Sequence, residues 1–191
     1  MDRTSVKIVV AGGFGTGKTT MVGSVSEIPP LTTEEVLTQA SVGVDDVTGV
    51  EGKTNTTVAL DFGRITISDD VILYLFGTPG QDRFWFMWDE LAQGAVGAVV
   101  LVDTRRLESS FAAIDYFERR DIPFVAAVNR FWGECQYSED EIRSALELQP
   151  IVPMVWCDAR DRSSSKQALI ALVQHAMARM LVARSASQPR S

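Results

Sequence analysis

The residues best suited to chemistry form one continuous segment near the start of the chain, Gly12-Gly13-Phe14-Gly15-Thr16-Gly17-Lys18-Thr19. This segment fits the pattern G-x-x-x-x-G-K-[ST] in full. Its glycines let successive backbone N–H groups turn inward and form a nest for an anion. We expect Lys18 to reach the β- and γ-phosphates of a nucleotide as a catalytic point charge, and Thr19 to place its hydroxyl on Mg²⁺. The segment therefore predicts a site for the phosphate chain of a nucleotide.

Such a loop needs a strand before it and a helix after it, and the neighbouring sequence predicts both. Residues 6–11 form an apolar run, and residues 18–26 have a helical pattern. A helix that begins directly after the loop points its positive N-terminal end at the phosphates. This strand–loop–helix context favours phosphate binding over a glycine-rich turn that matches the pattern by chance.

The rest of the chain alternates between β-branched apolar runs and helical patterns. Further strands are predicted at 56–62, 65–68, 71–76, 96–102, 124–129 and 151–157, and further helices at 82–93, 107–119, 139–146 and 165–183. The alternation predicts an α/β fold with a mostly parallel, doubly wound sheet and helices on both faces. We expect one domain over residues 1–183 and a flexible polar tail at 184–191. The connection at 28–53 is long and rich in turn residues, and loops of that length are usually functional or disordered.

Two further motifs resemble the switch segments of Ras-like small GTPases. Residues 76–84 resemble the D-x-x-G-Q segment that opens switch II, so that the Gly80 N–H would sense the γ-phosphate and Gln81 would orient the attacking water. A Pro-Gly turn after a strand is the simpler explanation. Thr57 resembles the switch I threonine that gives Mg²⁺ a second hydroxyl. Thr54 and Thr56 compete for that role, and plain β-propensity is the alternative.

The order of these motifs resembles a prokaryotic Ras-superfamily GTPase over nearly the whole chain. Within that group the chain is most similar to the MglA-like proteins and the small GTPases of actinobacterial conservon operons. The resemblance implies a P-loop NTPase fold with six strands and five helices, GTP/GDP and Mg²⁺ as ligands, a Roadblock-type partner and a sensor-kinase-like protein. It implies nucleotide contacts from Gly12, Gly13, Phe14, Gly15, Thr16, Gly17, Lys18, Thr19, Thr20, Thr57, Gly80, Asn129, Arg130, Asp158, Ala159 and Arg160.

The chain departs from the Ras pattern at two phosphate-side positions. Gly77 stands where Ras-type proteins have an aspartate that holds a water on Mg²⁺, a loss shared by MglA-like proteins, and Asp45 or Asp46 of the long loop could substitute for it. Phe14 stands where Ras has glycine. Its ring could shield the phosphates and hinder an arginine finger, or it could pack on the switch II helix.

The base-binding segment departs further from the family. Asn129 begins the N-K-x-D position, but the fourth residue is Trp132 and carries no carboxylate for guanine. By resemblance, Asn129 would bond N7, the Arg130 stem would lie along the base, and the Ala159 N–H would meet O6. Glu134 could replace the lost carboxylate. GTP is expected from the family, while ATP or a loss of discrimination stays open.

Five bulky residues follow one another in the predicted switch II helix: Phe84, Trp85, Phe86, Met87 and Trp88. Because they point around all sides of a helix, they favour an exposed partner surface over a helix that is buried between the sheet and the 107–119 helix. The acidic run after Ser138 is interpreted as a helix start, with Ser138 as its N-cap.

Composition limits the class of protein. The 191 residues carry a net charge of −7 without a cluster of basic residues, which argues against nonspecific nucleic-acid binding. Two cysteines without metal-binding spacing favour a cytoplasmic protein. No segment approaches the roughly 18 apolar residues that span a bilayer, so we expect that a partner would bring the protein to a membrane.

These features together predict a molecular switch that binds guanine nucleotide, hydrolyses GTP slowly and signals through a surface that depends on the nucleotide. A nucleotide-binding interaction module with little hydrolysis or relaxed base specificity is the first alternative. An ATP-dependent phosphotransferase is the second, with thin support from the arginines at 119–120 and 160–162.

Overall fold

The computed structural model describes residues 3–29, 31–37, 56–80, 86–131 and 136–186. One seven-stranded sheet runs through these residues in the order β2-β3-β4-β1-β5-β6-β7. Its strands are β1 (Thr4–Ala11), β2 (Leu31–Leu37), β3 (Thr56–Ser68), β4 (Val71–Gly77), β5 (Ala95–Val102), β6 (Phe124–Asn129) and β7 (Met154–Cys157). The strands from β4 to β7 pair in parallel, whereas β2, β3 and β4 pair antiparallel. The predicted α/β class is confirmed.

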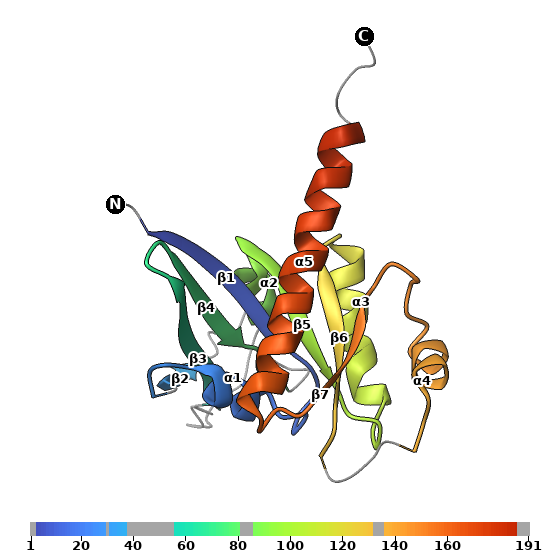
Figure 1. Ribbon diagram of the computed structural model, residues 1–191. Helices are drawn as coiled ribbons and strands as arrows, with labels where there is room; N and C mark the ends of the chain where they lie inside the picture. Colours follow the sequence, from blue (N-terminus) through green and yellow to red (C-terminus); the bar gives the residue numbers. More distant parts are fainter. Residues whose placement is uncertain (1–2, 30, 38–55, 81–85, 132–135, 187–191) are drawn as a thin grey trace, which may run out of the picture.

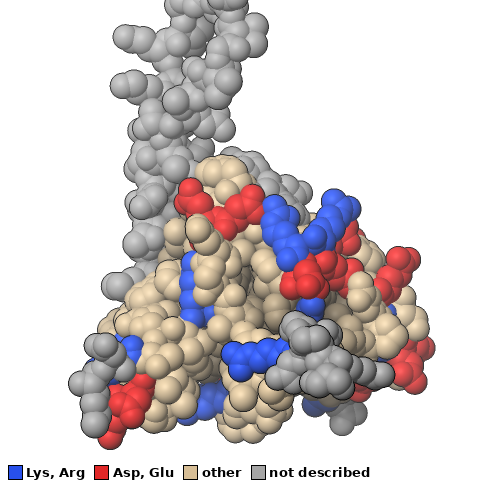
Figure 2. Space-filling model, turned by 90° about the horizontal axis from the view of Figure 1, so that it is seen from above, with Lys and Arg blue, Asp and Glu red and all other residues tan. Residues whose placement is uncertain are grey.

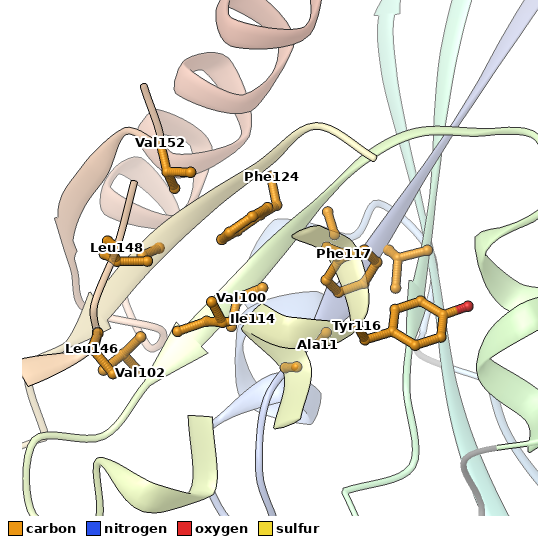
Figure 3. Packing of buried hydrophobic residues seen from close by; sticks show 14 of the residues in the cluster. Ala11, Val100, Val102, Ile114, Tyr116, Phe117, Phe124, Leu146, Leu148 and Val152 are labelled. Carbon is orange, nitrogen blue, oxygen red and sulfur yellow. The ribbon is translucent and has the colours of Figure 1, made fainter. Parts of the chain in front are cut away.

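Helices cover both faces of the sheet, as Figure 1 shows. They are α1 (Lys18–Val25), α2 (Phe86–Ala92), α3 (Glu108–Arg119), α4 (Glu139–Ala145) and α5 (Arg162–Ala186). One hydrophobic cluster joins the sheet to α2, α3 and α4, and a second joins it to α1 and α5. Figure 3 shows the first cluster, in which Phe117 and Ile114 of α3 pack on Val100 and Phe124 of the central strands.

The central strand β5 follows the burial that its sequence predicts. Ala98, Val100 and Val102 pack in the cluster under α3, while Val99 and Leu101 pack in the cluster under α5. Side chains on a strand alternate between faces, so a strand covered on both sides must be apolar throughout. Because β5 is fixed in this way, the residues that follow its carboxyl end are held in a defined place.

Four features differ from the sequence-based expectation, and one of them is that β7 begins at Met154 and not at residue 151. The sheet has one strand more than the six expected. This strand, β2, lies within the connection at 28–53, which was expected to be a loop, and it pairs antiparallel with β3 from Leu31↔Phe62 to Leu37↔Thr56. Turn residues dominate that connection as a whole, but residues 31–37 are mainly Leu, Thr and Val, which favour strands. The two runs at 56–62 and 65–68 form the single strand β3. Helix α5 continues to Ala186, three residues into the expected tail.

No helix in the described ranges is long and apolar enough to cross a bilayer. Figure 2 shows a face of the molecule on which acidic and basic side chains lie in small mixed groups among uncharged ones. Such a mixture is expected for a chain with a net charge of −7.

Candidate nucleotide-binding site

The glycine-rich loop between β1 and α1 has a lysine folded into it. Lys18 Nζ donates to the carbonyl oxygens of Gly12 at 3.0 Å and Gly13 at 2.7 Å, and the Thr16 hydroxyl donates to the same Gly13 oxygen at 3.0 Å. Gly12, Gly15 and Gly17 have positive φ angles, which side-chain-bearing residues rarely adopt. Burial lowers the pKa of Lys18 to about 8, although the nearby Asp61 carboxylate raises it. The loop therefore has glycines where its backbone needs positive φ angles, and the Lys18 amine is folded against its carbonyl oxygens.

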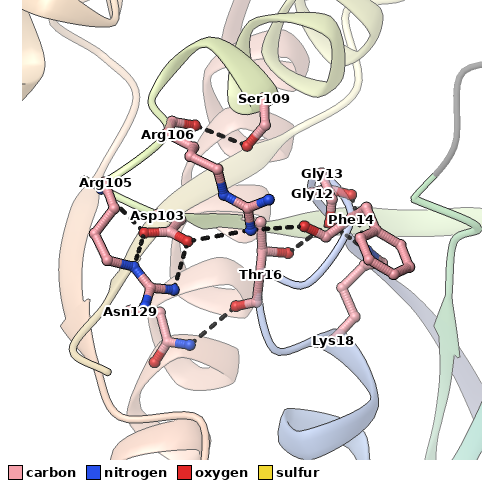
Figure 4. A network of polar contacts seen from close by, with 10 residues as sticks. All are labelled: Gly12, Gly13, Phe14, Thr16, Lys18, Asp103, Arg105, Arg106, Ser109 and Asn129. Carbon is pink, nitrogen blue, oxygen red and sulfur yellow. Dashed lines mark hydrogen bonds and ion pairs between the residues drawn. The ribbon is translucent and has the colours of Figure 1, made fainter. Parts of the chain in front are cut away.

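Residues that follow β5, which the sequence analysis did not single out, hold the phosphate loop in place. Asp103 follows β5, is fully buried, and contacts both Arg105 and Arg106 at 2.8 and 3.5 Å. Burial disfavours its charged form, but the hydrogen bonds from Arg105 prevail and lower its pKa. Arg106 Nη2 then donates to the Phe14 carbonyl oxygen at 3.0 Å (Figure 4). The sequence signal was present, because polar residues at the carboxyl end of a central strand lie at the ligand edge of such a sheet.

The aromatic ring in the loop is not covered by the fold. Phe14 is 67% exposed, so its ring is not buried against the described part of α2. Its backbone carbonyl is fixed by Arg106, as noted above. Of the two roles left open by the sequence, the exposure favours a ring at the mouth of the phosphate site.

A carboxylate from β3 lies where the missing switch II aspartate would be. Asp61 pairs with Gly77 across the β3–β4 ladder, and a Cβ added to Gly77 would lie 2.9 Å from the Asp61 Cβ and 3.0 Å from its Oδ2. The Thr19 hydroxyl donates to Asp61 Oδ2 at 2.7 Å. Gly77 therefore makes room for Asp61. The sequence suggested Asp45 or Asp46 for this role, and both lie outside the described ranges. The sequence analysis did not identify Asp61 on the neighbouring strand.

These oxygen atoms fit a magnesium ion. Mg²⁺ prefers hard oxygen ligands and is usually held by one or two carboxylates together with phosphates and water. Thr19 and Asp61 provide a hydroxyl and a carboxylate beside the phosphate loop. Within the described residues no group of three or more acidic, histidine or cysteine side chains gathers. The side chain of Thr57, the other predicted metal ligand, lies outside the described part.

The turn after β4 closes onto the phosphate loop. Thr78 N donates to the Val10 carbonyl at 2.9 Å, and a Cβ on Gly80 would lie 2.8 Å from both Lys18 Nζ and Phe14 Cα. Only glycine allows this approach, since Phe14 contributes backbone atoms that cannot rotate away. Gln81, the predicted water-orienting residue, lies outside the described residues.

The base side of the site is organised by Asn129 at the end of β6. Its Nδ2 donates to the Thr16 carbonyl at 2.9 Å, and its Oδ1 accepts the Ala159 N–H at 3.0 Å. The side chain thus joins the phosphate loop to the ends of β6 and β7. The Ala159 N–H, expected to meet guanine O6, is instead engaged by Asn129 in this structure. Trp132 and Glu134 lie outside the described residues.

A pocket of about 260 Å³ lies next to Asn129, and it contains three of the predicted base contacts. Its lining residues are Arg130, Trp156, Cys157, Asp158, Arg160 and Ser164. Arg130 lies 4.8 Å from the centre of the Trp156 ring, and Arg160 is paired with Asp158 at 2.8 Å. The structure therefore brings Lys18 and Thr19, predicted to bind phosphate, and Arg130, Asp158 and Arg160, predicted to bind the base, to one edge of the sheet.

The expected aromatic partner surface is largely buried where it is described. Met87 and Trp88 are 9% and 4% exposed, and Trp88 packs edge-on against Tyr116 of α3 at 5.2 Å. Trp88 therefore lies between the sheet and α3, which is the alternative to an exposed surface that the sequence left open. Phe86 is 59% exposed. Phe84 and Trp85 lie outside the described residues.

Comparisons with known proteins bear on the family and the fold of this chain. Residues 10–179 match the sequence model of a family described as conserved hypothetical ATP binding protein. An uncharacterized protein of Methanocaldococcus jannaschii is 32% identical over 132 residues, which cover 68% of this chain and 73% of that protein. The crystal structure of the G domain of the T. maritima iron transporter FeoB aligns with a TM-score of 0.61 at 16% identity, covering 91% of this chain and 99% of that one, and so supports the fold alone. With its phosphate loop formed, this chain is a nucleotide-binding P-loop protein with the fold of a G domain, and it belongs to the family described as conserved hypothetical ATP binding protein.

Proposed function

We propose that this chain is a molecular switch that binds guanine nucleotide with Mg²⁺ and hydrolyses GTP slowly. The observation that carries the proposal is the close approach of Gly80 to Lys18 and the Phe14 backbone, where an added Cβ would lie 2.8 Å from Lys18 Nζ and from Phe14 Cα. Lys18 is the residue that binds the terminal phosphates in this loop. A γ-phosphate held by Lys18 therefore meets Gly80 directly, whereas a diphosphate leaves that contact unchanged. The turn after β4 is thus sensitive to the presence of the third phosphate.

A hydrogen bond extends this sensitivity to α2. Trp88 Nε1 donates to the Pro79 carbonyl at 3.3 Å, and Trp88 is packed among α3 residues. A movement of Gly80 therefore pulls on the residue that anchors α2 in the core. Phe86 begins α2 and is exposed, and we propose that its position follows the nucleotide. Phe86, with the neighbouring Phe84 and Trp85, is the proposed partner surface.

Each part of the site has a role in this cycle. Lys18 binds the β- and γ-phosphates and neutralises their charge. Thr19 and Asp61 would hold Mg²⁺ beside the phosphate chain. Mg²⁺, when bound, neutralises charge that develops on the phosphate oxygens. Gln81 would orient the attacking water, by resemblance to small GTPases. Slow hydrolysis is expected because Phe14 lies exposed at the mouth, where a finger from another protein would have to enter.

The narrower resemblance to MglA-like and conservon GTPases supports a role in signal transduction. Such proteins commonly act with Roadblock-type partners, and conservons also encode a sensor-kinase-like protein. We extend both partners to this chain as part of the proposal, together with a cytoplasmic location and recruitment to the membrane by a partner.

The alternative with a specific observation behind it is a nucleotide-binding module of relaxed base specificity. The matched family is described as ATP binding, and the Asn129 segment lacks the aspartate that reads guanine. In that case nucleotide would hold the fold together, with little turnover. A phosphotransferase has no such support in the described site.

One experiment separates these functions. Nucleotide is extracted from the purified full chain and identified, and single-turnover hydrolysis of GTP and ATP is then measured with Mg²⁺, in wild type, Gln81→Leu and Gly80→Ala. A switch predicts bound GDP, slow GTP cleavage that Gln81→Leu abolishes, and a loss of selective GTP binding in Gly80→Ala. Bound nucleotide without turnover favours the module. A protein without measurable nucleotide affinity contradicts both.

A further inference from the structure

The base pocket has an unusual balance of hydrogen-bonding groups. Arg130 follows β6, and the residues from Asp158 to Ser164 follow β7, so two neighbouring parallel strands build it. Among its described lining residues the charged groups are two guanidinium groups and one carboxylate. A protein recognises the 2-amino group of guanine with a hydrogen-bond acceptor. Whether the carboxylate is free to accept therefore decides which edge of a base the pocket can recognise.

The carboxylate of Asp158 is already occupied by Arg160. Its Oδ1 accepts from the Arg160 backbone N–H at 3.0 Å and from Nε at 2.9 Å, and its Oδ2 accepts from Nη2 at 2.8 Å. An ionised carboxylate offers about four acceptor positions, and one arginine takes three of them. These hydrogen bonds lower the pKa of Asp158, so the pair persists at neutral pH. A base that used both oxygens of this carboxylate would first have to displace Arg160, because only about one acceptor position is left.

The donors of the pocket are held in place. The Arg130 guanidinium lies over the Trp156 ring with 4.8 Å between its carbon and the ring centre, a cation–π arrangement that fixes its plane. The Arg130 backbone N–H donates to the Cys157 carbonyl at 2.7 Å, which fixes the residue against β7. Asn129 donates one amide hydrogen to Thr16, and its amide carries a second. Both residues therefore present N–H groups at the end of β6.

This arrangement suits one edge of a purine. Guanine presents two acceptors, O6 and N7, on its major-groove edge, whereas adenine presents N7 and the N6 amino donor. Hypoxanthine and xanthine share O6 and N7 with guanine and differ at position 2. N–H donors can hydrogen-bond to both acceptors of a 6-oxopurine, O6 and N7. At adenine N6 they would face another donor. The described donors of the pocket are thus complementary to any 6-oxopurine.

We propose that Arg130, together with Asn129, selects 6-oxopurine nucleotides over adenine nucleotides through O6 and N7, and that the pocket does not distinguish the group at position 2. The inference rests on the proposed function, because it requires a purine nucleotide on the phosphate loop. It assigns base selection to donors in place of the carboxylate that the N-K-x-D pattern would provide.

The test is a competition series with four nucleotides against a fluorescent GDP analogue on the full chain. GTP, ITP and XTP should bind within about threefold of one another, and ATP at least about tenfold more weakly, as a bidentate arginine contact with a base can provide. Arg130→Met keeps an unbranched apolar stem of similar reach and removes the donors. It should reduce the GTP-to-ATP ratio to below about threefold by weakening the three 6-oxopurines and not ATP. The control is Arg119→Met, an exposed arginine of α3, which should leave the ratio unchanged.

Each contrary outcome has a separate meaning. ATP binding as tightly as GTP in the wild type overturns the inference, and so does an unchanged ratio in Arg130→Met. ITP and XTP binding at least about tenfold more weakly than GTP also overturns it, because an acceptor would then be reading position 2. A failure of all four nucleotides and of the GDP analogue to bind overturns the proposed function itself, which the other outcomes leave standing.

Discussion

At the scale of single residues, the protonation of Lys18 controls how the phosphate loop works. Burial lowers its pKa to about 8, against 10.5 for the free side chain. Between these values the unfolded chain keeps a proton that the folded chain has lost, so this residue makes the folded state more stable as pH rises from 8 to 10.5. Phosphate binding has the opposite dependence, because it needs the charged amine.

We therefore predict that triphosphate affinity falls above pH 8, by up to about tenfold per pH unit, as one proton must be taken up on binding. Calorimetry at pH 8.5 in buffers of different ionisation enthalpy measures that proton directly. In Lys18→Arg the side chain stays charged, so the triphosphate affinity that the variant retains should not depend on pH above 8. An affinity independent of pH up to 9.5 in the wild type would contradict the assignment.

The Asp61 carboxylate leads to a second prediction at this scale. Asp61→Asn keeps the shape and the hydrogen bond from Thr19 but removes the charge beside the metal position. The Mg²⁺ concentration needed for half-maximal nucleotide retention should rise about tenfold or more, as second-shell or ligand changes typically produce. Magnesium titration of the release of a fluorescent nucleotide measures this. Asp70→Asn, an exposed aspartate in the turn after β3, is the matched control and should leave the titration unchanged.

The Asp61 position also shows what residue-level reasoning could and could not predict. The phosphate loop was predictable, because its spacing and its neighbours in sequence determine its geometry. Asp61 was not, because its role depends on the register that places it opposite Gly77. The burial of Met87 and Trp88 was missed for a similar reason, since α3 supplies Tyr116 and Phe117 to cover an otherwise exposed aromatic surface. Tertiary contacts of this kind leave no local signal.

At the scale of elements, the boundaries that were predicted well have local causes. Helix α4 begins where expected because Ser138 accepts the Glu141 N–H, and the Glu141 carboxylate accepts the Ser138 N–H at 2.8 Å. This capping box is complete within four residues. Strand β2 was missed because turn residues dominate the connection around it, and its partner β3 lies far along the sequence, with Leu31 opposite Phe62.

The capping box gives a prediction for α4. Ser138→Ala removes an acceptor for the first turn and should lower the free energy of unfolding by about 1 kcal/mol. Urea unfolding followed by circular dichroism measures the change. Ser144→Ala lies in the same helix at an exposed position without a cap role, so it should be neutral within about 0.5 kcal/mol. Equal effects in the two variants would show that the cap contributes nothing.

At the scale of the whole molecule, α5 has two different halves. Its first half packs on the sheet through Ala168, Leu169 and Leu172, whereas Leu181 near its end is 62% exposed, and in Figure 1 the helix projects beyond the sheet. Leu172 is fully buried, and a Cβ on Gly97 of β5 would lie 2.8 Å from its Cδ1. The absence of a side chain at Gly97 therefore lets α5 lie close to the central strand.

The same substitution in the two halves of α5 should have very different effects. Leu172→Ala leaves a cavity between α5 and β5 and should lower the free energy of unfolding by about 2–5 kcal/mol. Leu181→Ala removes a side chain that is mostly in water and should change it by less than about 0.5 kcal/mol. Urea unfolding of both variants measures the difference, and nucleotide retention measured in parallel shows whether the carboxyl ends of β5 to β7 have shifted. If Leu181→Ala were as destabilising as Leu172→Ala, the projecting half of α5 would have to pack against another surface in solution, which a dependence of the effect on protein concentration would reveal.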